Sequence, residues 1–234
     1  MQDYPAAAAE LKFVVDENLA DSIRQWMRSE LGPDAHGVGI NNDGYQTTTL
    51  YFDTEDFDHF FKRRSFARAK FRIRRYNGAG TIFLERKMKV NGYVSKRRSH
   101  CAIEDLGRLS SPGPDWSGSW FEHRLENRRL RPVCEVAYNR TARVGMSDNG
   151  LLRLTLDTNL RAAPATRIGF KDAVSVEIEP GVAILEMKYR VHVPPLFKRL
   201  IEEFGLVSRS HSKYRTAIRA LGLVSEEKGM ALSV

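Results

Sequence analysis

One stretch of the chain, AKFRIRRYNG, alternates cationic and apolar residues as a β-strand would. Lys70, Arg72 and Arg74 have one parity, and Phe71 and Ile73 have the other. Because side chains alternate between the two faces of a strand, three positive charges line up on one face and apolar groups on the opposite face. A sheet of such strands has one face to bury and one face to hydrate or neutralise.

The same division recurs in most segments that read as strands, where charged and polar residues of one parity alternate with mainly apolar neighbours. These charged and polar residues are Glu85, Lys87 and Lys89; Arg153, Thr155 and Asp157; Glu177 and Glu179; and Glu186, Lys188 and Arg190. The eight expected strands cover residues 10–15, 47–53, 70–76, 81–90, 134–144, 151–160, 174–179 and 182–191. Short connections such as the NGAG turn favour hairpins, so the sheet is expected to be antiparallel.

Helices are expected to be fewer than strands. They lie within residues 16–31, 54–64, 194–206 and 212–222. Asp16 is a residue type common at helix N-caps, while Pro195 and Gly205 are typical of a helix start and a helix end. The segment 110–120 is rich in Pro, Gly and Ser and reads as a loop.

Composition narrows the class of partner. The 234 residues carry a formal net charge of +8 and give a pI of about 9.6, which indicates a polyanionic partner such as phosphates, nucleic acid or an anionic membrane. No run of eighteen apolar residues and no secretory signal occurs, so no membrane segment is expected. Two cysteines without metal-type spacing read as reduced, buried thiols of a cytoplasmic protein. Without repeats or a low-complexity linker, residues 1–234 are expected to form a single domain with its core at about 10–220.

The charged faces create an energetic problem if the sheet closes on itself. Each unpaired buried ion costs several kcal/mol, so six or eight of them would cost tens, against a total stability of roughly 5 to 15 kcal/mol. A closed interior must therefore be wet or filled by an anionic ligand. Cations that bind phosphate oxygens and carboxylates that bind a divalent metal would suit a polyphosphate. An ordinary sheet with one hydrated face remains the alternative.

Nine motifs in order resemble those of VTC domains, the polyphosphate polymerase domains of the vacuolar transporter chaperone complex, which also occur as free-standing bacterial proteins. The motifs are ELKFVV, LYFDT, KFRIRRY, FLERKMK, GYVSKRR, YNRTA, LTLDTNL, ILEMKY and HSKYRTA, and they span about residues 10–220. These domains belong to the triphosphate tunnel metalloenzyme (CYTH-like) superfamily. The resemblance implies an α+β fold, an eight-stranded antiparallel β-barrel with helices packed outside. It also implies ATP as phosphoryl donor, Mn²⁺ or Mg²⁺ as cofactor and polyphosphate as product.

The resemblance further implies the residues of the site. Catalytic roles fall to Arg72, Arg74, Lys87, Arg140 and Lys213, and phosphate binding to Lys12, Lys96, Tyr138, Ser212 and Lys188, with Glu186 as metal ligand. One departure is plain: the superfamily opens on Glu-x-Glu-x-Lys, but Ala8 stands at the first glutamate position and only Glu10 and Lys12 are kept. This departure weakens a metal role for the first strand and leans away from a typical triphosphatase.

Three functions stay open at this point. The first is polymerisation, in which the ionised terminal phosphate of the chain attacks ATP and needs no strong general base. The second is hydrolysis of inorganic triphosphate or a nucleotide on the same fold, and the third is non-catalytic binding of a polyanion. Nucleic acid is not expected as the partner, because Phe13 and Phe71 fall on the faces opposite to Lys12 and Arg72. The sequence contains neither a P-loop motif nor a zinc-type cluster.

Overall fold

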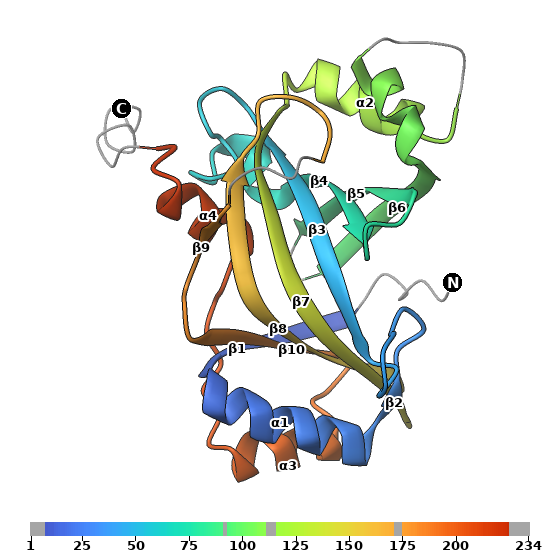
Figure 1. Ribbon diagram of the computed structural model, residues 1–234, viewed down its shortest axis with the longest axis vertical. Coiled ribbons are helices and arrows are strands. Elements are labelled where there is room, and N and C mark those ends of the chain that lie inside the picture. The colour runs from blue at the N-terminus through green and yellow to red at the C-terminus, as the bar shows by residue number, and fades with distance from the viewer. Residues whose placement is uncertain (1–7, 91–92, 111–115, 171–174, 225–234) are drawn as a thin grey trace.

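The computed structural model describes residues 8–90, 93–110, 116–170 and 175–224, which form ten β-strands, four α-helices and two 3-10 helices (Figure 1). The strands are β1 (Ala8–Asp16), β2 (Gly32–Pro33), β3 (Gly44–Asp53), β4 (Ala69–Tyr76), β5 (Thr81–Val90), β6 (Tyr93–Ala102), β7 (Arg131–Ser147), β8 (Gly150–Pro164), β9 (Val176–Glu177) and β10 (Val182–Arg190). The helices are α1 (Glu17–Glu30), α2 (Ser119–Asn127), α3 (Pro195–Glu203), α4 (Lys213–Ala220), η1 (Arg64–Arg68) and η2 (Ile103–Ser110).

All ten strands belong to one antiparallel sheet, so the expected α+β class with an antiparallel sheet is confirmed. The strands pair in the order β1-β10-β8-β7-β3-β4-β5-β6, while β2 pairs with β7 and β9 pairs with β8. The expected count of eight strands was too low. The strand β6 was not predicted, and only a two-residue strand, β9, forms within the segment predicted at 174–179.

The expected closed barrel is not what the hydrogen bonds form. The path of paired strands ends at β1 and β6, which do not pair with each other in the described part of the chain. The chain approaching α4 reaches the edge of β1 that is not paired with β10, where the backbone N–H of Arg209 donates to the carbonyl of Lys12 at 2.8 Å. The two sides meet through side chains instead, since Lys87 of β5 donates to Glu10 of β1 at 2.9 Å.

The predicted alternation of faces is confirmed along the central strands. Leu154 and Leu156 of β8 and Met187 of β10 are buried in a cluster with residues of α1 and α3, on what we call the outer face. A second outer cluster covers β3, β4 and β5 with residues of η2 and α2. Figure 1 shows α1 and α3 together at one end of the molecule and α2 at the other. The charged residues of opposite parity therefore share the inner face.

The inner face is not charged along its whole length. A third apolar cluster joins Val136, Tyr138 and Ile184 of the sheet to Tyr214 and Ile218 of α4. The common parity of Val136, Tyr138 and Arg140 is thereby explained, because all three face inward and α4 covers the first two. The pairing of β7 with β8 also shifts register between Ala137 and Asn139.

Three of the four expected helices are confirmed as α1, α3 and α4. The carboxylate of Asp16 accepts from the N–H of Leu19 at 2.8 Å and caps α1, as predicted. The helix expected within 54–64 was wrong: Phe57 and Lys62 have φ values of 55° and 56°, and the segment forms turns. The carboxylate of Asp53 holds these turns by accepting the N–H groups of His59 and Phe60.

Other expectations fall partly outside the described residues. Those are the loop at 111–115, the start of the strand at 174 and the side chain of Lys89. The loop expected at 110–120 was wrong at its end, because residues 119 and 120 belong to α2, which begins at Ser119. Cys101 and Cys134 are buried free thiols, as predicted.

Candidate functional site

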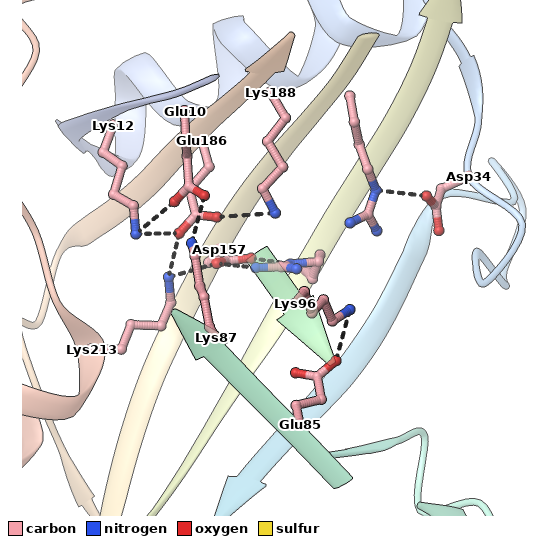
Figure 2. Close-up of polar contacts among 12 residues, drawn as sticks. Glu10, Lys12, Asp34, Glu85, Lys87, Lys96, Asp157, Glu186, Lys188 and Lys213 are labelled. Atoms are coloured by element: carbon pink, nitrogen blue, oxygen red, sulfur yellow. Dashed lines mark hydrogen bonds and ion pairs between the residues drawn. The ribbon is translucent and has the colours of Figure 1, made fainter. Parts of the chain in front are cut away.

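One cavity on the inner face is lined by side chains from β1, β3, β4, β5, β7 and β10 and from the start of α4 (Figure 2). Its volume is about 550 Å³ including the part open to solvent. It is lined by Glu10, Lys12, Tyr51, Lys70, Arg72, Arg74, Lys87, Tyr138, Arg140, Glu186, Lys188, Ser212, Lys213 and Tyr214. Eight lysines and arginines thus face two glutamates, so the cavity is strongly electropositive and suits an anion.

The structure brings together ten of the eleven residues expected from the sequence. Those lining the cavity are Lys12, Arg72, Arg74, Lys87, Tyr138, Arg140, Glu186, Lys188, Ser212 and Lys213. Lys96 is the exception. Its side chain is 40% exposed, and its ammonium lies 2.9 Å from a carboxylate oxygen of Glu85 rather than in the cavity (Figure 2).

Asp157 lies behind the cavity and orients two of its cations. Arg140 donates to both oxygens of Asp157 through Nε at 2.6 Å and Nη2 at 2.7 Å, while Lys213 Nζ lies 2.6 Å from Oδ2. Burial raises the pKa of Asp157, but the charges of Arg140 and Lys213 outweigh it and lower the pKa overall. A fully buried carboxylate therefore fixes the directions in which these two cations point.

Glu85 is a second buried carboxylate that orients a cation of the cavity, on the side of β4 and β5. Its carboxylate accepts from Arg72 Nε at 2.7 Å and lies 2.9 Å from Lys96 Nζ and 3.1 Å from Arg98 Nε. Burial raises its pKa, but Arg72, Arg74, Lys96 and Arg98 together hold it well below the usual value. One buried anion therefore holds Arg72 in place, and Arg74 is further held by donating to Thr49 at 3.2 Å.

Glu10 and Glu186 meet across β1 and β10 through Lys12, whose ammonium lies 3.0 Å from each carboxylate (Figure 2). Burial and the charge of Glu186 raise the pKa of Glu10, but Lys188, Lys12 and Lys87 hold it well below its usual value. Burial also raises the pKa of Glu186, and its cationic neighbours again outweigh burial. Both carboxylates are therefore ionised at neutral pH.

This pair fits the divalent metal that the fold implies. Carboxylate oxygens are the preferred ligands of Mg²⁺, which usually takes one or two of them and completes its shell with water and substrate phosphates. Within the described residues, no group of three or more His, Cys, Asp and Glu could hold a metal ion. Glu186 and Glu10 would therefore hold the ion together with a bound phosphate, not as a complete protein cage.

Lys70 is a cavity residue that the predicted set omitted. Its ammonium donates to Ser212 Oγ at 3.3 Å. Burial, followed by the positive charges of Lys12, Lys87 and Arg72, lowers the pKa of Lys70 to about 7. The alternation of β4 already placed it with Arg72 and Arg74, and this parity was the signal that could have added it. A bound anion would offset the charges that lower its pKa.

Tyrosines close the cavity toward α4. The rings of Tyr51 and Tyr214 lie 5.3 Å apart, and Tyr214 donates its hydroxyl proton to the buried carboxylate of Asp53. The guanidinium of Arg140 lies 5.2 Å from the ring of Tyr138, and the ammonium of Lys213 lies 5.0 Å from it. Phe13 and Phe71 do face away into the outer clusters as predicted, but aromatic rings still line this site.

Three solved structures share the fold at 14% sequence identity, a level that shows the fold alone. A protein of Bacillus halodurans provisionally described as an adenylate cyclase has a TM-score of 0.54, covering 88% of this chain and 95% of that chain. PH1819 of Pyrococcus horikoshii OT3 has a TM-score of 0.50, covering 91% and 99%. A protein of Vibrio parahaemolyticus, also provisionally described as an adenylate cyclase, has a TM-score of 0.50, covering 91% and 98%.

The antiparallel sheet with a cationic cavity on its inner face defines a protein of the triphosphate tunnel fold class, a fold that phosphoryl-transfer enzymes generally use. The model of the VTC domain family matches residues 7–222, and the chain belongs to this family. None of the curated proteins matches the chain. Within the described residues, every helix is too short or too polar to cross a bilayer.

Proposed function

We propose that this protein is a polyphosphate polymerase, which transfers the γ-phosphoryl group of ATP to the terminal phosphate of a polyphosphate chain. The observation that carries the proposal is the cavity itself, in which eight cations and two glutamates face one partly open space. Such a site stabilises a phosphate chain through charge and position, which is most of what phosphoryl transfer requires. Membership of the VTC domain family supports the same reaction.

In this proposal, arginines fixed by buried carboxylates bind the transferred group. Arg72 and Arg140 are held by Glu85 and Asp157, so little reorganisation is needed when negative charge spreads over the equatorial oxygens. Arg74 and the ammonium groups of Lys87 and Lys213 complete the catalytic set. The attacking phosphate is already ionised at neutral pH, so the reaction needs no strong base.

The remaining lining residues bind the rest of the chain. We assign phosphate contacts to Lys12, Lys188, Tyr138 and Ser212, as expected from the sequence, and add Lys70 beside Ser212. Lys96 then acts indirectly by holding Glu85.

Mn²⁺ or Mg²⁺ is the proposed cofactor, with Glu186 and Glu10 as its protein ligands. When bound, the ion would neutralise phosphate oxygens and help to orient them. Two buried free thiols further support a reducing compartment, the cytoplasm.

The test is a product assay on purified protein incubated with ATP and Mn²⁺, resolved on a polyacrylamide gel stained for polyphosphate. A ladder is expected, and Arg74→Ala should abolish it. Arg75→Ala is the matched control, because Arg75 has the opposite parity and its Nε donates to Ala79 in the hairpin turn at 2.8 Å. A ladder of wild-type intensity from Arg74→Ala would remove this residue from the site.

A second candidate is a triphosphatase that uses water as nucleophile. The observation that favours it is the apolar cluster of α4 with Val136 and Tyr138, which ends the charged inner face and suits a short substrate. Incubation with inorganic triphosphate separates the two functions. Free phosphate without a ladder from ATP would support hydrolysis, and unchanged ATP and triphosphate would support a binding protein.

A further inference from the structure

Four arginines gather on the outside of the molecule, on the face of β5 and β6 opposite to the cavity and beside α2. Arg86 and Arg97 are directly paired across β5 and β6. Arg124 lies in α2 and Arg128 is its C-cap residue four positions later, so both lie on one side of the helix. We call Arg86, Arg97, Arg124 and Arg128 the outer arginine cluster.

This arrangement repels itself in the absence of a ligand. Like charges directly opposite on a sheet are destabilising, and so are like charges four residues apart on a helix. None of the four guanidinium groups forms an ion pair with a carboxylate of the described residues. Burial, followed by the charges of Arg124, Arg97 and Arg128, lowers the pKa of Arg86, so the other three cations act on its guanidinium.

One polar atom of the cluster is buried without a partner. The Nε atom of Arg86 is inaccessible to solvent and makes no hydrogen bond in the described structure. A buried donor left unpaired is costly, and buried polar atoms in folded proteins nearly always have a partner. An unpaired donor therefore lies within the outer arginine cluster.

Neighbouring side chains hold two of the other arginines, Arg97 and Arg128, in place. The guanidinium of Arg97 lies 4.5 Å from the ring of Trp120, and that of Arg128 lies 5.1 Å from the ring of Phe66. Arg128 also donates from Nη1 to Ser65 Oγ at 3.3 Å. Planar groups fixed in this way lose little freedom when they bind an oxyanion.

We propose that the outer arginine cluster is a second polyanion site, which binds the part of a polyphosphate chain that extends beyond the cavity. This inference rests on the proposed function. The connection is β6, an edge strand in which Arg97 stands between Lys96 and Arg98, both of which lie against Glu85 on the cavity side. A chain that leaves the cavity over this edge passes from those cations to Arg97 and then to the other three arginines.

Linear polyphosphate fits the cluster better than other polyanions do. Its repeating oxyanions match guanidinium groups, which bind phosphate through two parallel hydrogen bonds. Single-stranded nucleic acid would need exposed aromatic faces for its bases, but Arg97 and Arg128 already cover Trp120 and Phe66. The large apolar side chains that are exposed in the described residues, such as Ile40 and Met146, belong to other segments, so membrane insertion is not favoured here.

The test compares two probes, inorganic triphosphate and long-chain polyphosphate, on the full chain. Arg97 and Arg124 are exposed, so the double variant Arg97→Gln/Arg124→Gln should fold. The matched control is Arg24→Gln/Arg199→Gln on α1 and α3, at the opposite end of the molecule (Figure 1). It removes the same charge from two arginines that are paired with Asp21 and Glu30.

The outer double variant is expected to bind long-chain polyphosphate about tenfold more weakly and triphosphate as the wild type does. The slope of log affinity against log salt for the long chain should fall by roughly 1.4, at about 0.7 for each phosphate contact of a single-stranded polyanion. The control double variant should keep the wild-type affinity for both probes.

Other outcomes overturn the inference. Equal long-chain affinity in the outer variant and the control removes the cluster from the binding site, and loss of triphosphate binding shows that it is no separate site. A third outcome is that the outer double variant keeps its affinity for polyphosphate and binds single-stranded RNA or phosphatidylglycerol vesicles more weakly than the wild type does. That result would assign the cluster to the RNA or to the vesicle surface. Failure of the wild type to bind even triphosphate would instead refute the proposed function of the cavity.

Discussion

Replacing Lys70 by methionine is expected to stabilise the ligand-free protein, and to do so more at pH 6 than at pH 9. The side chain is buried beside the cations Lys12, Lys87 and Arg72, and within the described residues it donates its hydrogen bond to the neutral hydroxyl of Ser212. Methionine keeps an apolar stem of similar length but has no charge. The variant therefore removes a cation that the empty cavity disfavours.

The size of the effect follows from the pKa of Lys70, which burial and neighbouring cations lower from 10.5 to about 7. Below pH 7 the folded protein bears the full penalty, about 4.8 kcal/mol for a difference of 3.5 pKa units. Between pH 7 and pH 10.5, Lys70 is mostly neutral in the folded protein and mostly protonated in the unfolded chain. The penalty therefore falls by about 1.4 kcal/mol for each pH unit in this range. Loss of the hydrogen bond to Ser212 subtracts about 1 kcal/mol. The expected gain is about 4 kcal/mol at pH 6 and about 1 kcal/mol at pH 9.

Urea unfolding followed by circular dichroism, in phosphate-free buffers at the two pH values, measures this gain. Lys198→Met is the matched control, because Lys198 is exposed on α3 and its replacement makes the same chemical change outside the cavity. A gain for Lys70→Met that is equal at both pH values would refute the reasoning, because the charge of Lys70 would then not be disfavoured in the folded state.

Three further outcomes are expected. At pH 8, triphosphate binding should take up about 0.9 proton more in the wild type than in Lys70→Met, because the bound anion restores the Lys70 charge. Calorimetry in buffers of different ionisation enthalpy measures this uptake, and equal uptake in the two proteins would contradict the prediction. Glu186→Gln should weaken Mn²⁺ binding to the triphosphate complex at least about tenfold, measured by calorimetric titration, since only Glu10 remains of the pair; unchanged affinity would place the ion elsewhere. Asp53→Ala should lower the free energy of unfolding by about 3 kcal/mol in urea, because buried N–H groups and the Tyr214 hydroxyl lose their acceptor; a loss below about 1 kcal/mol would show that other groups replace it.

The inner face of the sheet could be predicted from the sequence because parity is a local property. Once β4 is recognised as a strand, Arg72 and Arg74 must share a face, whatever the neighbouring strands do. The strand β6 escaped the same reasoning because Lys96, Arg97 and Arg98 are consecutive cations and show no alternation. Both faces of that strand are charged, one toward the cavity and one toward the outer arginine cluster.

The partners of the site residues depend on register, which parity does not determine. Glu85 lies opposite Arg72 and Arg98 only because β4, β5 and β6 pair at particular residues. The position of α4 is likewise a long-range result, since no local pattern places Tyr214 against Asp53, 161 residues earlier in the chain. For this reason seven of the eight cavity cations were predicted as site residues, while the buried carboxylates Glu85 and Asp157 that position them were not.

The unpaired boundary between β1 and β6 has a consequence for how a long polymer could be loaded. In a barrel closed by backbone hydrogen bonds, a linear molecule must be threaded from one of its ends. Within the described residues the two sides are joined by side-chain contacts such as that between Glu10 and Lys87, so separating β1 from β6 would break no ladder of peptide groups there. A polymer that entered between these two strands would not have to be threaded from one of its ends.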